Sequence, residues 1–308
     1  MSHNGMIRER RDRGAVRFPR LARVSLPQPM PSSRPVEPVP DFDLRPFLDF
    51  IAAWLAGGAN VVMQLSWPEV GYGVHESKWD RGALVKHPFK RARTTGTYLA
   101  VAMVGTERDI AVFREAVNDA HRVVRSGPDS PVSYNAFSPE LQLWVAACLF
   151  YGPYDYYCRI YGEPAPEVAE AFYRHCGRFA TSLQVPAEMW PATLADFWDY
   201  WASALSRVSI DDTIREMLLD ILHARFLPGP LRRLVGRPLR FVNVGFLPPE
   251  FRAAMRLEWT DADERRLRRV LRGVRMLNRV TPGPVRRAPL YLNLWDMRLR
   301  HRLGLRLT

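Results

Sequence analysis

Helix-start signals recur along this chain, and they constrain its fold more than any other feature. A capping box is a Thr or Ser followed three residues later by an acid, and the two together bind the free N–H groups of a helix's first turn. Three pairs are of the form Thr-x-x-Asp: Thr106–Asp109, Thr193–Asp196 and Thr260–Asp263. Ser138-Pro139-Glu140 adds a capping hydroxyl, a proline at the first helical position and an acid. The chain is therefore expected to be mostly or wholly helical.

The segments that follow these signals carry apolar residues at helical spacing. In 141–149 the apolar side chains recur at i, i+3, i+4, i+7 and i+8, which places them on one helix face. We expect Gly152-Pro153 to kink or break that helix. No segment shows sustained alternation of apolar and polar residues, and 239–246 is read as a short strand or an extended connection. The predicted fold class is all-α, with a single helical domain.

The distribution of charge divides the chain into three parts. The 308 residues include 44 Lys or Arg against 32 Asp or Glu, which gives a net charge of +12. Eight arginines lie within the first 34 residues, among prolines and serines with little periodicity. We predict a basic arm at 1–40, a helical domain at 41–290 and a basic tail at 291–308. Such ends favour an anionic membrane surface over nucleic acid, because aromatic residues are not interleaved with the arginines, and they also fit solvated tails.

Cysteine usage and hydropathy predict the compartment. The three cysteines show no CxxC spacing and form no even set, which argues for a reducing environment. The basic N-terminal residues lack the apolar run of a signal peptide. The apolar stretch 50–67 contains a Gly-Gly pair, Asn60 and Gln64, so a buried helix pair is favoured over a membrane span. We therefore expect a cytoplasmic protein, peripheral at a membrane if its basic ends bind one.

The common catalytic motifs are missing from the sequence. It contains no Gly-rich phosphate loop, no HExxH, no GxSxG and no paired Cys/His finger. This pattern excludes an ordinary nucleotide-binding protein and a typical zinc hydrolase. What remains is a set of polar residues within apolar, helix-forming segments.

His121 is the most informative of these residues. It lies four residues after Val117 and three before Val124, so a helix over 110–127 would place all three on its apolar face, with Arg125 one turn beyond. One reading is a core histidine whose ring nitrogens bind backbone groups. The other is a metal or haem ligand, because a neutral imidazole can bind iron through one nitrogen and donate a hydrogen bond through the other.

Two further clusters precede His121. Arg91 and Arg93 stand directly before Thr94-Thr95 at the start of an apolar helix, a pattern that fits an anion site or an ordinary capped helix. The stretch 57–79, which includes His75 and Glu76, fits a packing motif of two helices joined by a turn at Pro68. It also fits a place where a flat ligand lies close to Gly57-Gly58.

Taken together, these motifs resemble a known family. In this order and spacing, "GGANVVMQLSWPEVGYGV", "KRARTTGTYLAVAMVG", "HRVVRSG" and "YNAFSPELQLWVAACLF" are similar to the oxygenases that include the fungal MpaB-type enzymes and the catalytic domain of bacterial rubber oxygenases (latex-clearing proteins). The resemblance runs from about residue 45 to about 290. It implies an all-α, globin-like core, haem b held by one proximal histidine, and use of O2 on an apolar substrate.

The resemblance also implies roles for single residues. The proximal Arg-x-x-His-x-x-x-Arg pattern of the rubber oxygenases falls on Asn118, His121 and Arg125, so its first Arg is replaced. The distal Arg and Lys-Thr fall on Arg91 and Thr94-Thr95, so the lysine is replaced by Thr94 and the distal site is expected to be open or bound to water. Many relatives have His where this chain has Ala146.

The leading hypothesis is therefore a haem b-dependent oxygenase that uses O2 on an apolar small molecule or lipid-like substrate. His121 would bind iron, while Arg91, Arg93 and Arg125 would pair with the propionates or orient the proximal side. Thr95, with Glu76 or His75 as a base, would lie on the distal side.

Two alternatives remain open. Asn118 and Ala146 fit a non-catalytic haem- or hydrophobic-ligand-binding protein of the same fold. The basic ends fit a peripheral membrane or nucleic-acid-binding protein whose binding falls steeply with salt and does not need His121.

Overall fold

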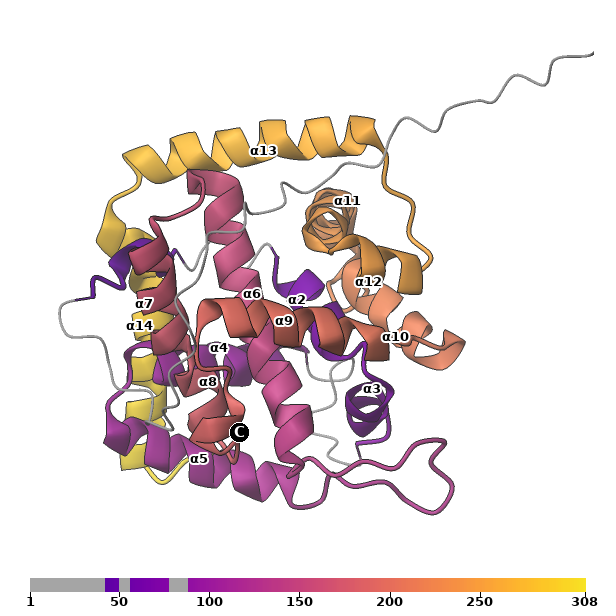
Figure 1. Cartoon of the computed structure of the whole chain (residues 1–308), viewed down its shortest axis with the longest axis vertical. Coiled ribbons are helices and arrows are strands. Elements are labelled where there is room, and N and C mark those ends of the chain that lie inside the picture. Colours follow the sequence, from indigo (N-terminus) through magenta and orange to yellow (C-terminus); the bar gives the residue numbers. More distant parts are fainter. Residues whose placement is uncertain (1–41, 50–55, 78–87) are drawn as a thin grey trace, which may run out of the picture. The chain divides into compact units, whose positions relative to one another are not determined.

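The computed structural model describes residues 42–49, 56–77 and 88–308, with the side chains of 88–91 left out. These residues form helices joined by turns and loops (Figure 1). The long helices are α4 (Pro88–Val104), α5 (Glu107–His121), α6 (Pro139–Tyr161), α11 (Gly229–Phe246), α13 (Asp261–Val280) and α14 (Gly283–Arg302). Shorter ones are α2 (Gly57–Gln64), α3 (Pro68–His75), α7 (Pro166–Cys176), α8 (Arg178–Thr181), α9 (Leu194–Ala204), α10 (Asp212–Leu222) and α12 (Pro249–Ala254). Single 3-10 turns lie at Arg45–Phe47, Ala187–Met189 and Leu205–Arg207.

The predicted helix starts are confirmed. Thr106, Thr193 and Thr260 each cap a helix, with the acid three residues on completing the capping box. Ser138 caps α6 through the backbone N–H of Leu141, and Pro139 is its first residue. The all-α fold class is confirmed as well: within the described residues there is no strand, only an isolated bridge between Arg125 and Asn135.

Three expectations about element boundaries are wrong. Residues 239–246 are not a strand or an extended connection; they form the last half of α11. The helix that carries His121 ends at that residue, so Val124 and Arg125 lie beyond it. The segment 291–308 is not simply a tail, because α14 continues through it to Arg302 and buries Leu294 and Met297.

Helix α6 forms the centre of the core and is continuous through Pro153, contrary to the predicted break. Proline lacks an N–H group and crowds the preceding turn, so backbone carbonyls there lose their usual partners. Close to this point, the side-chain amide of Asn60 in α2 donates to the Cys148 carbonyl at 2.7 Å and connects α2 to α6. Gly152 leaves the space for that side chain, since a Cβ at this position would overlap the Asn60 amide.

Aromatic stacking joins α6 to the helices around it. Trp144 is fully buried and stacks between Trp67 and Trp201, with ring centroids at 4.8 and 5.2 Å. Tyr151, two turns further along, stacks on the same Trp201 at 4.5 Å. Large buried aromatic rings contribute most of the apolar area in such a core. This stack fixes α6 relative to α9 and the start of α3.

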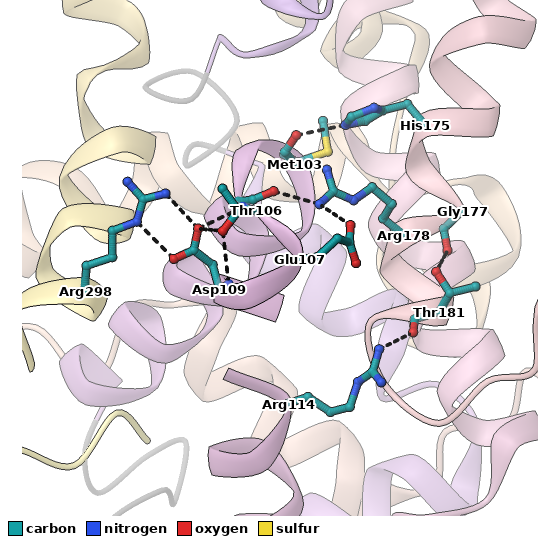
Figure 2. A network of polar contacts seen from close by, with 11 residues as sticks. Met103, Thr106, Glu107, Asp109, Arg114, His175, Gly177, Arg178, Thr181 and Arg298 are labelled. Carbon is teal, nitrogen blue, oxygen red and sulfur yellow. Dashed lines mark hydrogen bonds and ion pairs between the residues drawn. The ribbon is translucent and has the colours of Figure 1, made fainter. Parts of the chain in front are cut away.

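Helix α5 is held at its N-terminal end by a polar network (Figure 2). Arg298 of α14 binds both carboxylate oxygens of Asp109, at 3.0 and 2.7 Å. Arg114 donates to the carbonyls of Thr181 and Ser182, both at 2.8 Å, and Arg178 of α8 donates to the Gly105 carbonyl at 2.7 Å. These contacts set the axis of α5 and therefore the position of His121 at its far end.

No helix of the described residues is long and apolar enough to cross a membrane. Within 50–67, residues 57–64 form α2, with Ala59, Val62 and Met63 buried, and the predicted pairing with a second helix stays a prediction. Residues 50–55 and the predicted arm at 1–40 lie outside the described residues.

We predict that Arg298→Gln lowers the free energy of unfolding by about 1.5–3 kcal/mol at neutral pH. The substitution removes two charge-assisted hydrogen bonds from a carboxylate that is largely buried. Urea unfolding measures the effect. Arg300→Gln, which breaks only an i,i+4 surface pair with Asp296, is the matched control and should cost about 0.5 kcal/mol.

The same pair predicts a pH dependence. The Arg298 guanidinium and the Thr106 cap hold the pKa of Asp109 well below its usual range. A lowered folded-state pKa gives stability that is present above the unfolded pKa of about 4 and is lost as the pH falls below it. The difference between wild type and Arg298→Gln should therefore shrink on acidification below about pH 4. An equal difference at neutral and acidic pH would contradict this account.

Candidate functional site

A cavity of about 220 Å³ lies beside His121, between the ends of α3, α5 and α6. Its volume far exceeds the roughly 10–15 Å³ that one water molecule requires. Its apolar walls come from α3, α5, α6 and the segment after α8: Val70, Val74, Val117, Leu141, Val145 and Leu183. Its polar lining includes Gln64, Glu69, Thr94, His121, Tyr134 and Gln142. An apolar cavity with a few converging polar groups is the usual form of a small-molecule site.

His121 is the last residue of α5 and is half-buried in the cavity wall. Its ring meets Phe137 edge to face, with the ring centroids 6.3 Å apart. The backbone turns directly after it, as Val124 N–H donates to the His121 carbonyl at 2.9 Å. Val117 and Ala120 line the same cavity, so the C-terminal turn of α5 presents this face to it.

A chain of three amide side chains braces this turn of α5. Gln184 donates to Asn118, and Gln142 of α6 donates to Gln184 and to the Ala136 carbonyl, both at 2.7 Å. The backbone N–H of Gln184 returns a hydrogen bond to Gln142 at 3.0 Å. Gln142 is buried, so its amide needs these partners. Asn118, where the related pattern has Arg, thus connects α5 to this network.

Glu69 brings a carboxylate to the α3 side of the cavity. One oxygen accepts from Arg207 at 3.0 Å, and Arg207 also lies over the Trp67 ring at 3.7 Å. The other oxygen is buried, and the described part of the chain gives it no hydrogen-bond partner. An acid in this state can bind a donor group of a ligand within the cavity.

Tyr134 and Glu76 form a second polar pair near the cavity. The Tyr134 hydroxyl donates to a Glu76 carboxylate oxygen at 2.8 Å. Burial, together with this hydrogen bond, raises the pKa of Tyr134 to about 12. Tyr134 lines the cavity and therefore presents a protonated phenol, while Glu76 stands behind it at the end of α3.

The structure brings some of the predicted site residues together and separates others. His121 and Thr94 line the cavity, whereas Thr95 is half-buried and outside the lining. His75 is exposed at the end of α3 and packs edge-on against Tyr72. The expectations for Thr95, Glu76 and His75 as catalytic groups stay predictions.

Two of the predicted propionate partners, Arg93 and Arg125, are not among the described residues that line the cavity. Arg125 is exposed beyond the end of α5. Arg93 is half-buried, and burial, followed by the charge of Arg300 on α14, lowers its pKa. Arg91 is helical within α4, but its side chain lies outside the described atoms. Their roles as cofactor-binding residues therefore stay predictions.

Sequence reasoning missed Glu69, Gln142, Gln184 and Tyr134 as parts of the site. Glu69 follows Pro68 in the first turn of a helix, where an acid already has an explanation as a favourable charge. The two glutamines and the tyrosine occur in no recognisable spacing. Only the packing of α3, α5 and α6 brings Glu69, Gln142 and Tyr134 to one cavity.

Haem b would need three things from this cavity: an axial nitrogen, apolar walls and cations for two propionates. His121 and the aliphatic walls fit the first two requirements. None of the described side chains that line the cavity is Lys or Arg. The volume is also below the roughly 300–1,000 Å³ of pockets that enclose drug-sized ligands, so these walls would enclose a porphyrin only in part. The described residues of the site thus fit axial ligation and apolar contact, and they supply no partner for the propionates.

The described part of the chain contains no metal site built from several protein ligands. It has no group of three or more His, Cys, Asp or Glu side chains placed to hold a metal ion. The cysteines Cys148 and Cys176 are buried in the core, and burial raises the pKa of both thiols. They are therefore poor thiolate ligands or nucleophiles.

Comparison with known proteins gives one family and two close relatives. The family model described as "ER-bound oxygenase mpaB/B'/Rubber oxygenase, catalytic domain" matches residues 44–276. The uncharacterized proteins Rv2237 of Mycobacterium tuberculosis and Mb2261 of Mycobacterium bovis are each 50% identical over 254 residues, which is 82% of this chain and 100% of the relative. No solved structure gives a significant match. The chain therefore belongs to the family of the mpaB oxygenases and the rubber oxygenase catalytic domains.

Proposed function

We propose that this protein is a haem b-dependent oxygenase that acts with O2 on an apolar small molecule or lipid-like substrate. The observation that carries the proposal is the position of His121, at the end of α5 in the wall of an otherwise mainly aliphatic cavity. Membership of an oxygenase family supports the reaction class. Bound haem supplies the O2 chemistry, while the protein contributes binding, orientation and the iron's environment.

His121 is the proposed axial ligand, and its surroundings keep it in place. The hydrogen bonds from Gln142 through Gln184 to Asn118 fix the last turn of α5. The network at the other end of the helix sets its axis (Figure 2). A ligand held from both ends of its helix is preorganised, so little reorganisation is needed on binding.

The other lining residues would position the substrate and exclude water. Val117, Leu141, Val145 and Leu183 present aliphatic surface, which favours an apolar substrate. Glu69 and Tyr134 are the polar groups that could orient it: Glu69 offers a buried acceptor oxygen, and Tyr134 keeps its proton up to high pH. The cavity therefore suits a substrate that has an apolar body and makes a small number of directional polar contacts.

A non-catalytic ligand-binding protein of the same fold is the second candidate. Two observations favour it: Ala146, where many relatives have His, is buried in the core of α6, and no described lining residue is cationic. Such a protein would bind haem or an apolar ligand without oxidising it. Consumption of O2 in the presence of apolar substrates separates the two candidates.

We predict that protein from haem-supplemented cells shows a strong Soret band, and that His121→Ala abolishes or shifts it. The change removes the only histidine ring among the described residues that line the cavity. His301→Ala is the control, because His301 is exposed on α14. A colourless wild-type protein that folds and does not take up haemin would refute the haem assignment.

We further predict that Val145→Phe weakens haemin binding by about 10- to 100-fold. The larger ring projects into the cavity, and overpacking of this kind costs about 1–3 kcal/mol. Val145→Thr keeps the shape and serves as the matched control. Haemin titration followed by absorbance measures the affinity. Equal affinity for both variants would show that haemin binds elsewhere.

A further inference from the structure

A groove of about 650 Å³ between α6 and α13 is lined almost entirely by arginine. Helix α13 contributes Arg265, Arg268, Arg269, Arg272 and Arg275. The sixth, Arg159 of α6, is already paired with Asp155 at 2.8 Å. Within the described part of the chain, no acidic side chain lines the groove and the five arginines of α13 form no ion pair. Like charges at i,i+3 and i,i+4 repel one another, and an external anion bound in the groove would relieve this repulsion.

The helix face that carries these arginines becomes apolar toward the C-terminal end of α13. Arg265, Arg269, Arg272, Met276 and Val280 lie at i, i+4, i+7, i+11 and i+15, so they share one face of the helix. Met276 and Val280 expose 59% and 76% of their surface to solvent. Leu277 and Val285, on either side of the turn into α14, are also exposed. The corner where α13 meets the start of α14 is thus aliphatic. The arginines lie further back along α13.

Helix α14 carries apolar side chains on two opposite faces. Leu290, Leu294 and Met297 are buried against the body of the protein, and α14 packs closely along α4. On the other face, Leu292, Trp295, Leu299 and Leu303 are exposed at helical spacing. Exposed aliphatic residues with a tryptophan, next to basic residues, are typical of helices that lie in a membrane interface.

The positive charge of the α13 surface decides which kind of partner can bind it. A second copy of the chain would place α13 against α13, and each helix carries seven arginines. The first 34 residues of the same chain carry eight, so they would also be repelled. Nucleic acid would neutralise the arginines but would leave Met276, Leu277 and Val280 in water. An anionic lipid bilayer satisfies both the arginines and the aliphatic corner.

We propose that the corner where α13 meets the start of α14 docks on the surface of an anionic phospholipid bilayer. The arginines of the groove bind lipid phosphates, and Met276, Leu277, Val280 and Val285 insert among the acyl chains. In Figure 1, α13 lies across the top of the view and α14 follows it down one side, at the outer edge of the described helices. This inference rests on the surface of the α13–α14 corner and its arginine groove, and it does not depend on haem binding.

Vesicle flotation of the full chain tests the proposal. The protein should float with vesicles of phosphatidylcholine and phosphatidylglycerol, not with phosphatidylcholine alone, and less at high salt. Arg269→Gln/Arg272→Gln should weaken partitioning by roughly 30-fold, at about fivefold for each arginine near the surface. Met276→Ser/Val280→Ser should weaken it by about tenfold or more, because the aliphatic corner no longer inserts.

The matched control is Arg108→Gln/Arg174→Gln, which removes the same charge from exposed positions on α5 and α7 and should float nearly like wild type. All six positions are exposed, and thermal melts followed by circular dichroism verify folding. Absence of flotation with anionic vesicles would overturn the proposal, as would an equal loss in the control. Duplex DNA binding that is unchanged in Met276→Ser/Val280→Ser, without vesicle binding, would assign the surface to nucleic acid instead.

Discussion

The ion pair between Asp109 and Arg298 joins the two parts of the molecule to which we assign function. It ties the start of α5, which ends in His121, to α14, whose first turn carries Val285 of the proposed membrane-binding surface. Asp109 also completes the cap of α5, so one carboxylate fixes both the beginning of that helix and its contact with α14. Charge-assisted, bidentate hydrogen bonds of this kind fix geometry as well as adding stability. The position of His121 therefore depends on a contact at the opposite end of its helix.

Local chemistry made the helix starts predictable from the sequence. A cap needs only a hydroxyl and an acid three residues apart, and the structure confirms this at Thr106, Thr193 and Thr260. The errors arose where distant residues decide the outcome. Helix α6 continues through Pro153 inside a core packed by residues distant in the sequence, among them Asn60, which donates to the Cys148 carbonyl. Residues 239–246 are helical because they continue α11 from Gly229, which the β-branched and aromatic residues there did not suggest.

The candidate site was predictable only in part, for the same reason. The apolar stripe of α5 led to His121, which does line the cavity. The neighbouring arginines could not be placed, since the end of α5 at His121 removes Arg125 from the helix face, and Arg93 lies near charged groups of α14. Glu69, Gln142 and Tyr134 reach the cavity through packing of helices far apart in the sequence. The family resemblance gave the order of motifs, but the lining depends on this chain's own side chains.

The central claim is that His121 binds haem iron. Resonance Raman spectroscopy of the ferrous haem-loaded protein tests it most directly, because an iron–histidine stretching band reports the axial bond itself. The account predicts a band that shifts when histidine is labelled with nitrogen-15 and disappears in His121→Ala. A band that persists unchanged in His121→Ala, or a haem-loaded protein without any iron–histidine band, would contradict it.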